Sequence, residues 1–163
     1  AEGVLAQDRR PIDLDDVVFD EAKRLRSTTG LQVDTAGVSG GRIDADPAAI
    51  RRLLRNLTDN AARHAHATVA LHLVQRNGQV VLDVDDDGPG IAAQDRARVL
   101  DRFIRLDDAR ARDAGGAGLG LAIAAELVTA HGGEIAIDAS PIGGTRVTLR
   151  FPAPDNAPDS TAS

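Results

Sequence analysis

The sequence predicts an α/β fold: a two-layer α/β sandwich in which a mixed sheet of about five strands packs on three helices. Segments with helical spacing of apolar residues alternate along the chain with segments of strand period. Asn77-Gly78 stands between two such alternating strands and is a strong signal of a β-hairpin. Hydrophobic residues make up 42% of the chain and aromatic residues only 2%, so Leu, Val, Ile and Ala must build the core.

The first half of the chain predicts two helices and two weak strands. Residues 14–28 carry apolar side chains at helical spacing. The segments 31–33 and 42–43 predict short strands. A second helix begins at Asp46-Pro47, with Asp as the N-cap and Pro at the first helical position, and runs to about residue 65.

The second half predicts four strands and two further helices. Strands over 68–76 and 79–85 flank the Asn-Gly turn. A short helix is expected near 94–100. A longer one spans 118–131 and ends at a Gly-Gly pair. The last two expected strands cover 134–138 and 145–151, around a turn rich in glycine.

Length, charge and composition limit the function. The 163 residues suffice for one domain, and a net charge of −6 argues against non-specific binding to nucleic acid. The chain has no cysteine, which excludes disulfides, thiolate metal sites and cysteine nucleophiles. No apolar run approaches the roughly 20 residues that span a bilayer, so we expect a cytoplasmic protein or fragment without membrane contact.

A polar stripe borders the apolar face of the second predicted helix. It contains Asn56, Asn60, Arg63 and His64, which lie close together at 100° per residue. A solvated helix face is one interpretation, but two asparagines in mid-helix cost stability without an evident gain. Asparagine oxygens suit Mg²⁺, and the neighbouring Arg and His suit phosphate oxygens, so a nucleotide-phosphate site is the functional interpretation.

Two glycine-containing segments suggest contact with a ligand. After a strand, residues 85–91 read DDDGPGI, where an Asp at the strand end can accept a hydrogen bond from an exocyclic amine such as that of adenine. An ordinary turn is the alternative. Residues 115–121 read GGAGLGL and are expected to begin a helix. The first backbone N–H groups of a helix have no partner within it and favour an anion. The Walker and Rossmann patterns are absent, and a hinge is the alternative.

Between these segments, residues 101–105 read DRFIR. Phe103 is a candidate anchor for a flap from which Arg105 reaches a terminal phosphate. A surface helix end with ordinary salt bridges explains the same residues equally well.

Taken in order, the motifs resemble the catalytic ATP-binding domain of bacterial sensor histidine kinases, of the GHKL (Bergerat) fold shared with gyrase B, Hsp90 and MutL. RRLLRNLTDNAARHA resembles the N box, DDDGPGI the first glycine motif, and DRFIR the F box. GGAGLGLAIAAELVTAHGG resembles the second glycine motif and GGTRVTL the last. The match covers about residues 11–152, between a remnant of a dimerisation helix or linker (1–10) and a disordered tail (153–163).

The resemblance implies roles for individual residues. Asn60 would be the principal Mg²⁺ ligand, with Asn56 a second ligand or a polar catalytic neighbour, and Arg105 would approach the γ-phosphate from a lid over about 101–117. The other implied ATP-binding residues are Arg63 and His64 at the phosphates, Asp87, Gly88, Gly90 and Ile91 at the base, Gly116, Ala117, Gly118, Leu119, Gly120 and Leu121 around the phosphates, and Thr145, which supports the adenine end through Asp87 or a water.

The resemblance also implies the activity. Mg-ATP would be bound and its γ-phosphoryl transferred to a histidine on a separate dimerisation domain, for relay to a response regulator. Gyrase-like relatives carry a Glu where this chain has Asn56, and because an amide cannot act as a base, ATP hydrolysis should be slow. No histidine here has the acceptor's sequence context, so the chain should not phosphorylate itself alone and should be monomeric.

Two other functions remain open at this point. One is a serine kinase of the same fold, similar to anti-sigma factors, that acts on a separate protein. The other is a module that only senses ATP or ADP or docks a partner. By the resemblance, the parent protein is an inner-membrane sensor that holds this domain on the cytoplasmic side.

Overall fold

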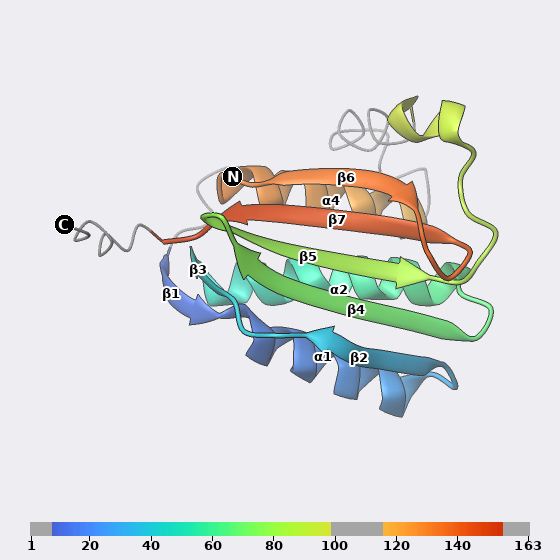
Figure 1. Cartoon of the computed structure of the whole chain (residues 1–163), viewed down its shortest axis with the longest axis horizontal. Coiled ribbons are helices and arrows are strands. Elements are labelled where there is room, and N and C mark those ends of the chain that lie inside the picture. The colour runs from blue at the N-terminus through green and yellow to red at the C-terminus, as the bar shows by residue number, and fades with distance from the viewer. Residues whose placement is uncertain (1–7, 99–115, 155–163) are drawn as a thin grey trace.

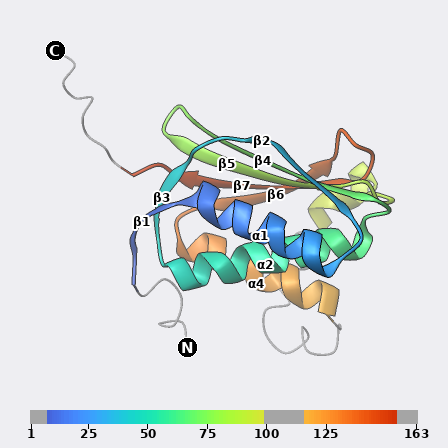
Figure 2. The same ribbon diagram turned by 90° about the horizontal axis from the view of Figure 1, so that it is seen from below.

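The molecule is a two-layer sandwich in which one sheet is covered on one face by three helices (Figures 1 and 2). This computed structural model describes residues 8–98 and 116–154, and for 116–122 the backbone alone. The elements are β1 (Arg10–Asp13), α1 (Leu14–Thr28), β2 (Gln32–Val38), β3 (Arg42–Ala45), α2 (Pro47–His64), β4 (Thr68–Arg76), β5 (Gln79–Asp86), α4 (Gly116–Ala130), β6 (Glu134–Ala139) and β7 (Thr145–Pro152). Residues 93–98 are also helical. The predicted fold class is confirmed.

The main sheet has the strand order β2-β4-β5-β7-β6. It is mixed, because β2 pairs with β4 in parallel and every other neighbouring pair is antiparallel. A bulge interrupts the β2–β4 ladder between Asp34 and Gly37. The β4–β5 hairpin turns at Asn77 and Gly78, both with positive φ, as their sequence predicts.

One short strand was not expected. Strand β1 pairs antiparallel with β3, and its first residue, Arg10, falls within the segment expected to be a remnant of a helix or linker. Asp8 and Arg9 are not helical either. Of the two alternatives for this segment, a helix does not fit residues 8–10, whereas residues 1–7 lie outside the described part. The four residues RPID are too few to show a strand or helix periodicity of apolar side chains. Pairing with β3 therefore decides their conformation.

The core lies between the sheet and the helices. Alternate residues of β4 and β5 point into it, as the period of two in a strand requires. The helices contribute the apolar stripes that their sequences predicted. The largest fully buried side chains include Phe151, Leu14, Leu25, Ile50, Leu53, Leu57, Leu71, Leu82 and Leu127.

Helix α2 lies between α1 and α4 and packs against both (Figure 2). Its N-cap is Asp46, whose side chain accepts hydrogen bonds from the amides of Ala48 and Ala49, as predicted. The imidazole of His131, buried just beyond α4, accepts a hydrogen bond from the Asp46 amide at 3.2 Å. The end of α4 therefore meets the start of α2. Because the two helices pack side by side, the start of α4 lies toward the end of α2.

Candidate nucleotide-binding site

Four segments with predicted site residues gather at one end of the sandwich. They are the C-terminal end of α2, the turn after β5, the β6–β7 turn and the N-terminal end of α4 (Figure 1). The turn after β5 packs directly on α2, because a Cβ added to Gly88 would lie 2.1 Å from the carbonyl oxygen of His64. The β6–β7 turn packs equally closely on the end of β5, since a Cβ added to Gly144 would lie 2.3 Å from Oδ1 of Asp86. Glycine at both positions brings these backbones together.

The two asparagines of α2 lie on one flank of the helix. The opposite flank faces α1, where Thr58 and Asp59 bind residues of that helix. At 100° per residue, Asn56 and Asn60 therefore lie on the flank toward α4. Within the described structure, Nδ2 of Asn56 and Oδ1 of Asn60 are buried and have no hydrogen-bond partner.

These orphaned atoms need a physical explanation. A buried polar atom without a partner loses about 1–3 kcal/mol of hydration, and such atoms are rare in native proteins. An amide oxygen is a hard, neutral donor that suits Mg²⁺, which proteins usually hold through one or two side chains together with water and substrate phosphates. Asn60 thus fits a magnesium ligand. Among the described residues, no cluster of three or more His, Asp or Glu side chains is placed to hold a metal by itself.

Asp86 is the buried acid of the turn after β5. It is 4% exposed, and its Oδ1 accepts hydrogen bonds from the amides of Gly88 at 2.9 Å and Thr145 at 3.3 Å. Within the described part, all its side-chain hydrogen bonds use Oδ1, which leaves Oδ2 available to a ligand. Thr145, expected to support the adenine end through Asp87 or a water, donates its backbone amide to Asp86.

The base-recognition role expected for Asp87 needs correction. Its carboxylate lies on the other side of the turn and accepts hydrogen bonds from the amides of His66 at 2.8 Å and Ala67 at 3.0 Å. These backbone hydrogen bonds, led by that of Ala67, lower the pKa of Asp87 below its ordinary value. Asp87 therefore ties the α2–β4 connection to the end of β5. The missed signal was the strand period: Val80, Leu82 and Val84 point into the core, so Asp86 shares their face.

The remaining expected site residues fall into three groups. Arg63 and His64 are exposed at the end of α2, where Nδ1 of His64 donates to the carbonyl of Asn60 at 3.0 Å. Gly90 lies against the Gly144 backbone, and the carbonyl of Ile91 accepts a hydrogen bond from Arg96 at 3.1 Å.

The third group is at the start of α4. Residues 116–121, which include Gly116, Gly118 and Gly120, form its first turns. The first N–H groups of a helix have no partner within it and favour an anion. The side chains of Ala117, Leu119 and Leu121 lie outside the described part, as do Arg105 and residues 99–115 of the expected lid.

Comparison with known proteins shows the family and the fold of the chain. Residues 45–155 match the family model described as histidine kinase-, DNA gyrase B- and HSP90-like ATPase. The chain belongs to this family. The ATP-binding domain of PrrB from Mycobacterium tuberculosis has the same fold, with 31% identity and a TM-score of 0.73 over 91% of this chain and 99% of that one. Full-length ShkA, solved in complex with AMPPNP, matches 90% of this chain and 31% of its own, with 28% identity and a TM-score of 0.73.

Relatives of this ATPase domain occur in much longer sensor proteins. The chain is 40% identical over 126 residues to the sensor protein RstB of Escherichia coli, which covers 77% of this chain and 29% of RstB. It is 37% identical over 121 residues to the sensor histidine kinase WalK of Bacillus subtilis, which covers 72% of this chain and 20% of WalK. The chain thus spans less than a third of either relative. In the described part, no helix is long and apolar enough to cross a membrane.

Proposed function

We propose that this ATPase-family domain binds Mg-ATP and is the catalytic domain of a sensor histidine kinase. The observation that carries the proposal is the buried, unpartnered Oδ1 of Asn60, on the flank of α2 toward α4. The nearby backbone N–H groups at the start of α4 are suited to phosphate oxygens.

Asp86 is the residue that we assign to the base. Its Oδ1 is held by two backbone amides, so the orientation of the carboxylate is set before a ligand arrives. A fixed Oδ2 can accept a hydrogen bond from the exocyclic amine of adenine, whereas guanine presents a carbonyl oxygen at that position and would be repelled. Gly88 and Gly90 allow the backbone around Asp86 to pack closely on α2 and on the β6–β7 turn.

Asn60, with Asn56 beside it, would hold Mg²⁺ through side-chain oxygen. The ion, when bound, neutralises charge on the phosphate oxygens. Arg63 and the imidazole of His64 are the exposed groups of α2 that we assign to phosphate contacts. Arg105 is proposed for the γ-phosphate from the family resemblance alone.

The reaction that we propose is transfer rather than hydrolysis. The γ-phosphoryl would pass to a histidine nitrogen on a separate dimerisation domain, leaving ADP, and a response regulator would receive it next. Asn56 carries an amide, which cannot take a proton from water, so this chain lacks a base at that position. Positioning and charge neutralisation then account for most of the catalysis.

The setting of this reaction is also part of the proposal. The histidine-bearing domain and the regulator are its protein partners, the site faces the cytoplasm, and the isolated domain is monomeric. No contact of this domain with membrane or nucleic acid is required.

Titration of ATP with and without Mg²⁺ tests the metal assignment. In the parent chain, we expect Mg²⁺ to tighten ATP binding by about tenfold or more. Asn60→Ala should remove most of this difference, because the protein would lose its principal oxygen ligand. Asn77→Gly is the matched control, since it alters an asparagine at a distant hairpin and preserves a positive φ.

Phosphotransfer is tested separately with labelled ATP and the histidine-bearing domain of the parent protein. Label on that histidine supports the kinase. Tight Mg-ATP binding without transfer in any pairing would leave a nucleotide-binding module and contradict the proposed activity. An equal Mg²⁺ effect in Asn60→Ala and the parent would contradict the ligand assignment alone.

A further inference from the structure

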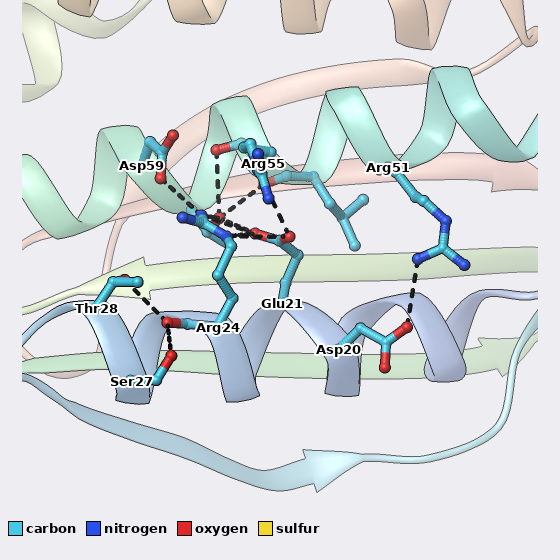
Figure 3. Close-up of polar contacts among 10 residues, drawn as sticks. Asp20, Glu21, Arg24, Ser27, Thr28, Arg51, Arg55 and Asp59 are labelled. Atoms are coloured by element: carbon cyan, nitrogen blue, oxygen red, sulfur yellow. Dashed lines mark hydrogen bonds and ion pairs between the residues drawn. The ribbon is translucent and has the colours of Figure 1, made fainter.

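A charged groove separates α1 from α2 on the flank opposite the asparagines (Figure 3). Its volume is about 480 Å³, and its lining includes Arg51, Arg52 and Arg55 of α2 and Asp20 and Glu21 of α1. Residues three and four apart are neighbours on a helix surface, so the three arginines form one cationic strip. Like charges at this spacing destabilise a helix unless anions offset them.

The acids of the groove are largely engaged within the protein. Glu21 is buried, and its carboxylate binds Arg24 at 2.9 Å and the hydroxyl of Thr58 at 2.8 Å. Arg24 also donates to Asp59 at 2.7 Å. Burial acts against the charge of Arg24, but the hydrogen bonds to Glu21 and Asp59 outweigh it and raise the pKa of the guanidinium above its ordinary value. Arg24 is shared between two carboxylates, so this cluster keeps one net negative charge for the three arginines of α2 (Figure 3).

The three arginines of the strip are therefore incompletely neutralised. Arg51 pairs with Asp20 at 3.3 Å, but both side chains are more than half exposed, so solvent screens their attraction. Arg55 reaches the occupied carboxylate of Glu21 only at 4.0 Å. In the described part of the chain, Arg52 has no ion pair. A positive strip thus persists on a protein whose net charge is −6.

We infer that this groove docks a helix of a partner protein that carries carboxylates one turn apart. Such a helix presents acids at the same spacing as Arg51, Arg52 and Arg55, so each guanidinium can meet a carboxylate. A nucleic acid fits less well, because its continuous phosphates would meet the repulsion of Asp20 and of an acidic molecule. The volume left between α1 and α2 can admit side chains of the docked helix.

The surface is distinct from the nucleotide site. Arg51 and Arg55 lie on the flank of α2 that faces α1, whereas Asn56 and Asn60 lie on the other flank. Charge changes at Arg51 and Arg55 therefore lie away from the candidate ATP-binding side chains, whereas Arg52 is one helical turn before Asn56. The inference goes beyond the proposed function and does not depend on it.

An alanine-rich helical peptide of about 18 residues, with glutamates one turn apart, is a suitable probe. We expect amide chemical shifts to change along the facing surfaces of α1 and α2 when it is added to the chain. The double variant Arg52→Glu/Arg55→Glu should weaken binding by about tenfold or more. The control Arg76→Glu/Arg150→Glu reaches the same net charge at exposed positions outside the groove and should bind like the parent.

Four outcomes would overturn the inference. They are an equal loss of affinity in both double variants, shift changes outside the groove, equal binding of a peptide with glutamine for glutamate, and tighter arginine-dependent binding of a single-stranded oligonucleotide. Urea unfolding of each variant verifies that the fold is retained. If the groove variant does not fold, Arg52→Gln, which removes one unpaired charge, is compared with Arg76→Gln in the same titration.

Discussion

Asp85, Asp86 and Asp87 follow one another in the chain, and each carboxylate binds a different set of partners. Asp85 lies on the sheet face away from the helices, where Arg146 donates to it at 2.8 and 2.9 Å and His72 lies at 3.2 Å. This hydrogen bonding raises the pKa of the Arg146 guanidinium. Because the strand turns successive side chains to opposite faces, adjacent acids are kept apart and separately neutralised.

The different surroundings of Asp86 and Asp87 predict different effects of the same substitution. Asp86→Asn should lower the affinity for ATP by about 10- to 100-fold, because the new amide N–H₂ would face the amine of adenine. Asp87→Asn should leave ATP affinity within about threefold of the parent. Calorimetric titration with ATP and GTP measures both, and GTP binding should be less affected by Asp86→Asn. A larger loss in Asp87→Asn would restore the original assignment.

Asp87 also predicts a pH dependence of stability. Its pKa is lowered in the folded state, so its charge stabilises the fold above the unfolded value of about 3.9. That contribution is lost as pH falls through the folded pKa. We expect the stability difference between the parent and Asp87→Asn to be full at neutral pH and to shrink in acid.

Urea unfolding at several pH values measures this difference. Asp44→Asn is measured alongside as the control, because the Asp44 carboxylate accepts no backbone hydrogen bond in the described structure. A difference for Asp87→Asn that stays constant down to acid pH would contradict the linkage.

At the scale of the elements, the packing of α2 on α4 is supplemented by hydrogen bonds of His131. Nδ1 of His131 donates to the carbonyl of Leu127 at 2.8 Å, and Nε2 accepts from the amide of Asp46. The ring thus serves as donor and acceptor at once, as only a neutral imidazole can. It links the start of α2 to the end of α4, and these helices also pack against each other.

Replacing the His131 imidazole should weaken the contact between the start of α2 and the end of α4. We expect His131→Leu to lower the free energy of unfolding by about 1–3 kcal/mol, because it removes two buried hydrogen bonds while keeping a similar volume. Urea denaturation measures the change, and the exposed His66 supplies the control His66→Leu. If the two variants lose equal stability, the link through His131 is not a significant contribution.

For the whole molecule, much of the fold could be predicted from the order of periodic segments. The helix at 14–28, the start at Asp46 and the Asn77-Gly78 hairpin agree with the structure. The parallel pairing of β2 could not be predicted, because it depends on contact with a strand more than thirty residues away. Strand β1 was missed for the same reason.

The candidate site residues could be selected from the sequence, but the surroundings of each side chain could not. Asn60 and the glycine segments lie at one end of the sandwich, as their order in the chain suggested. The choice between Asp86 and Asp87 depends on which face each side chain takes at the end of β5, and a difference of one residue reverses that face. Burial of the asparagine atoms became evident only from the packing of α2.

The bulge in β2 has a consequence for how copies of the domain meet one another. β2 is an outer strand of the main sheet, and an outer strand exposes hydrogen-bonding groups that invite a foreign strand. Asp34 places a carboxylate at this edge. Within the irregular stretch, it accepts a hydrogen bond from the amide of Ala36 at 2.9 Å. The irregular backbone and the negative charge at this edge both oppose pairing with a strand of a second molecule. Association of two copies through β2 is therefore disfavoured.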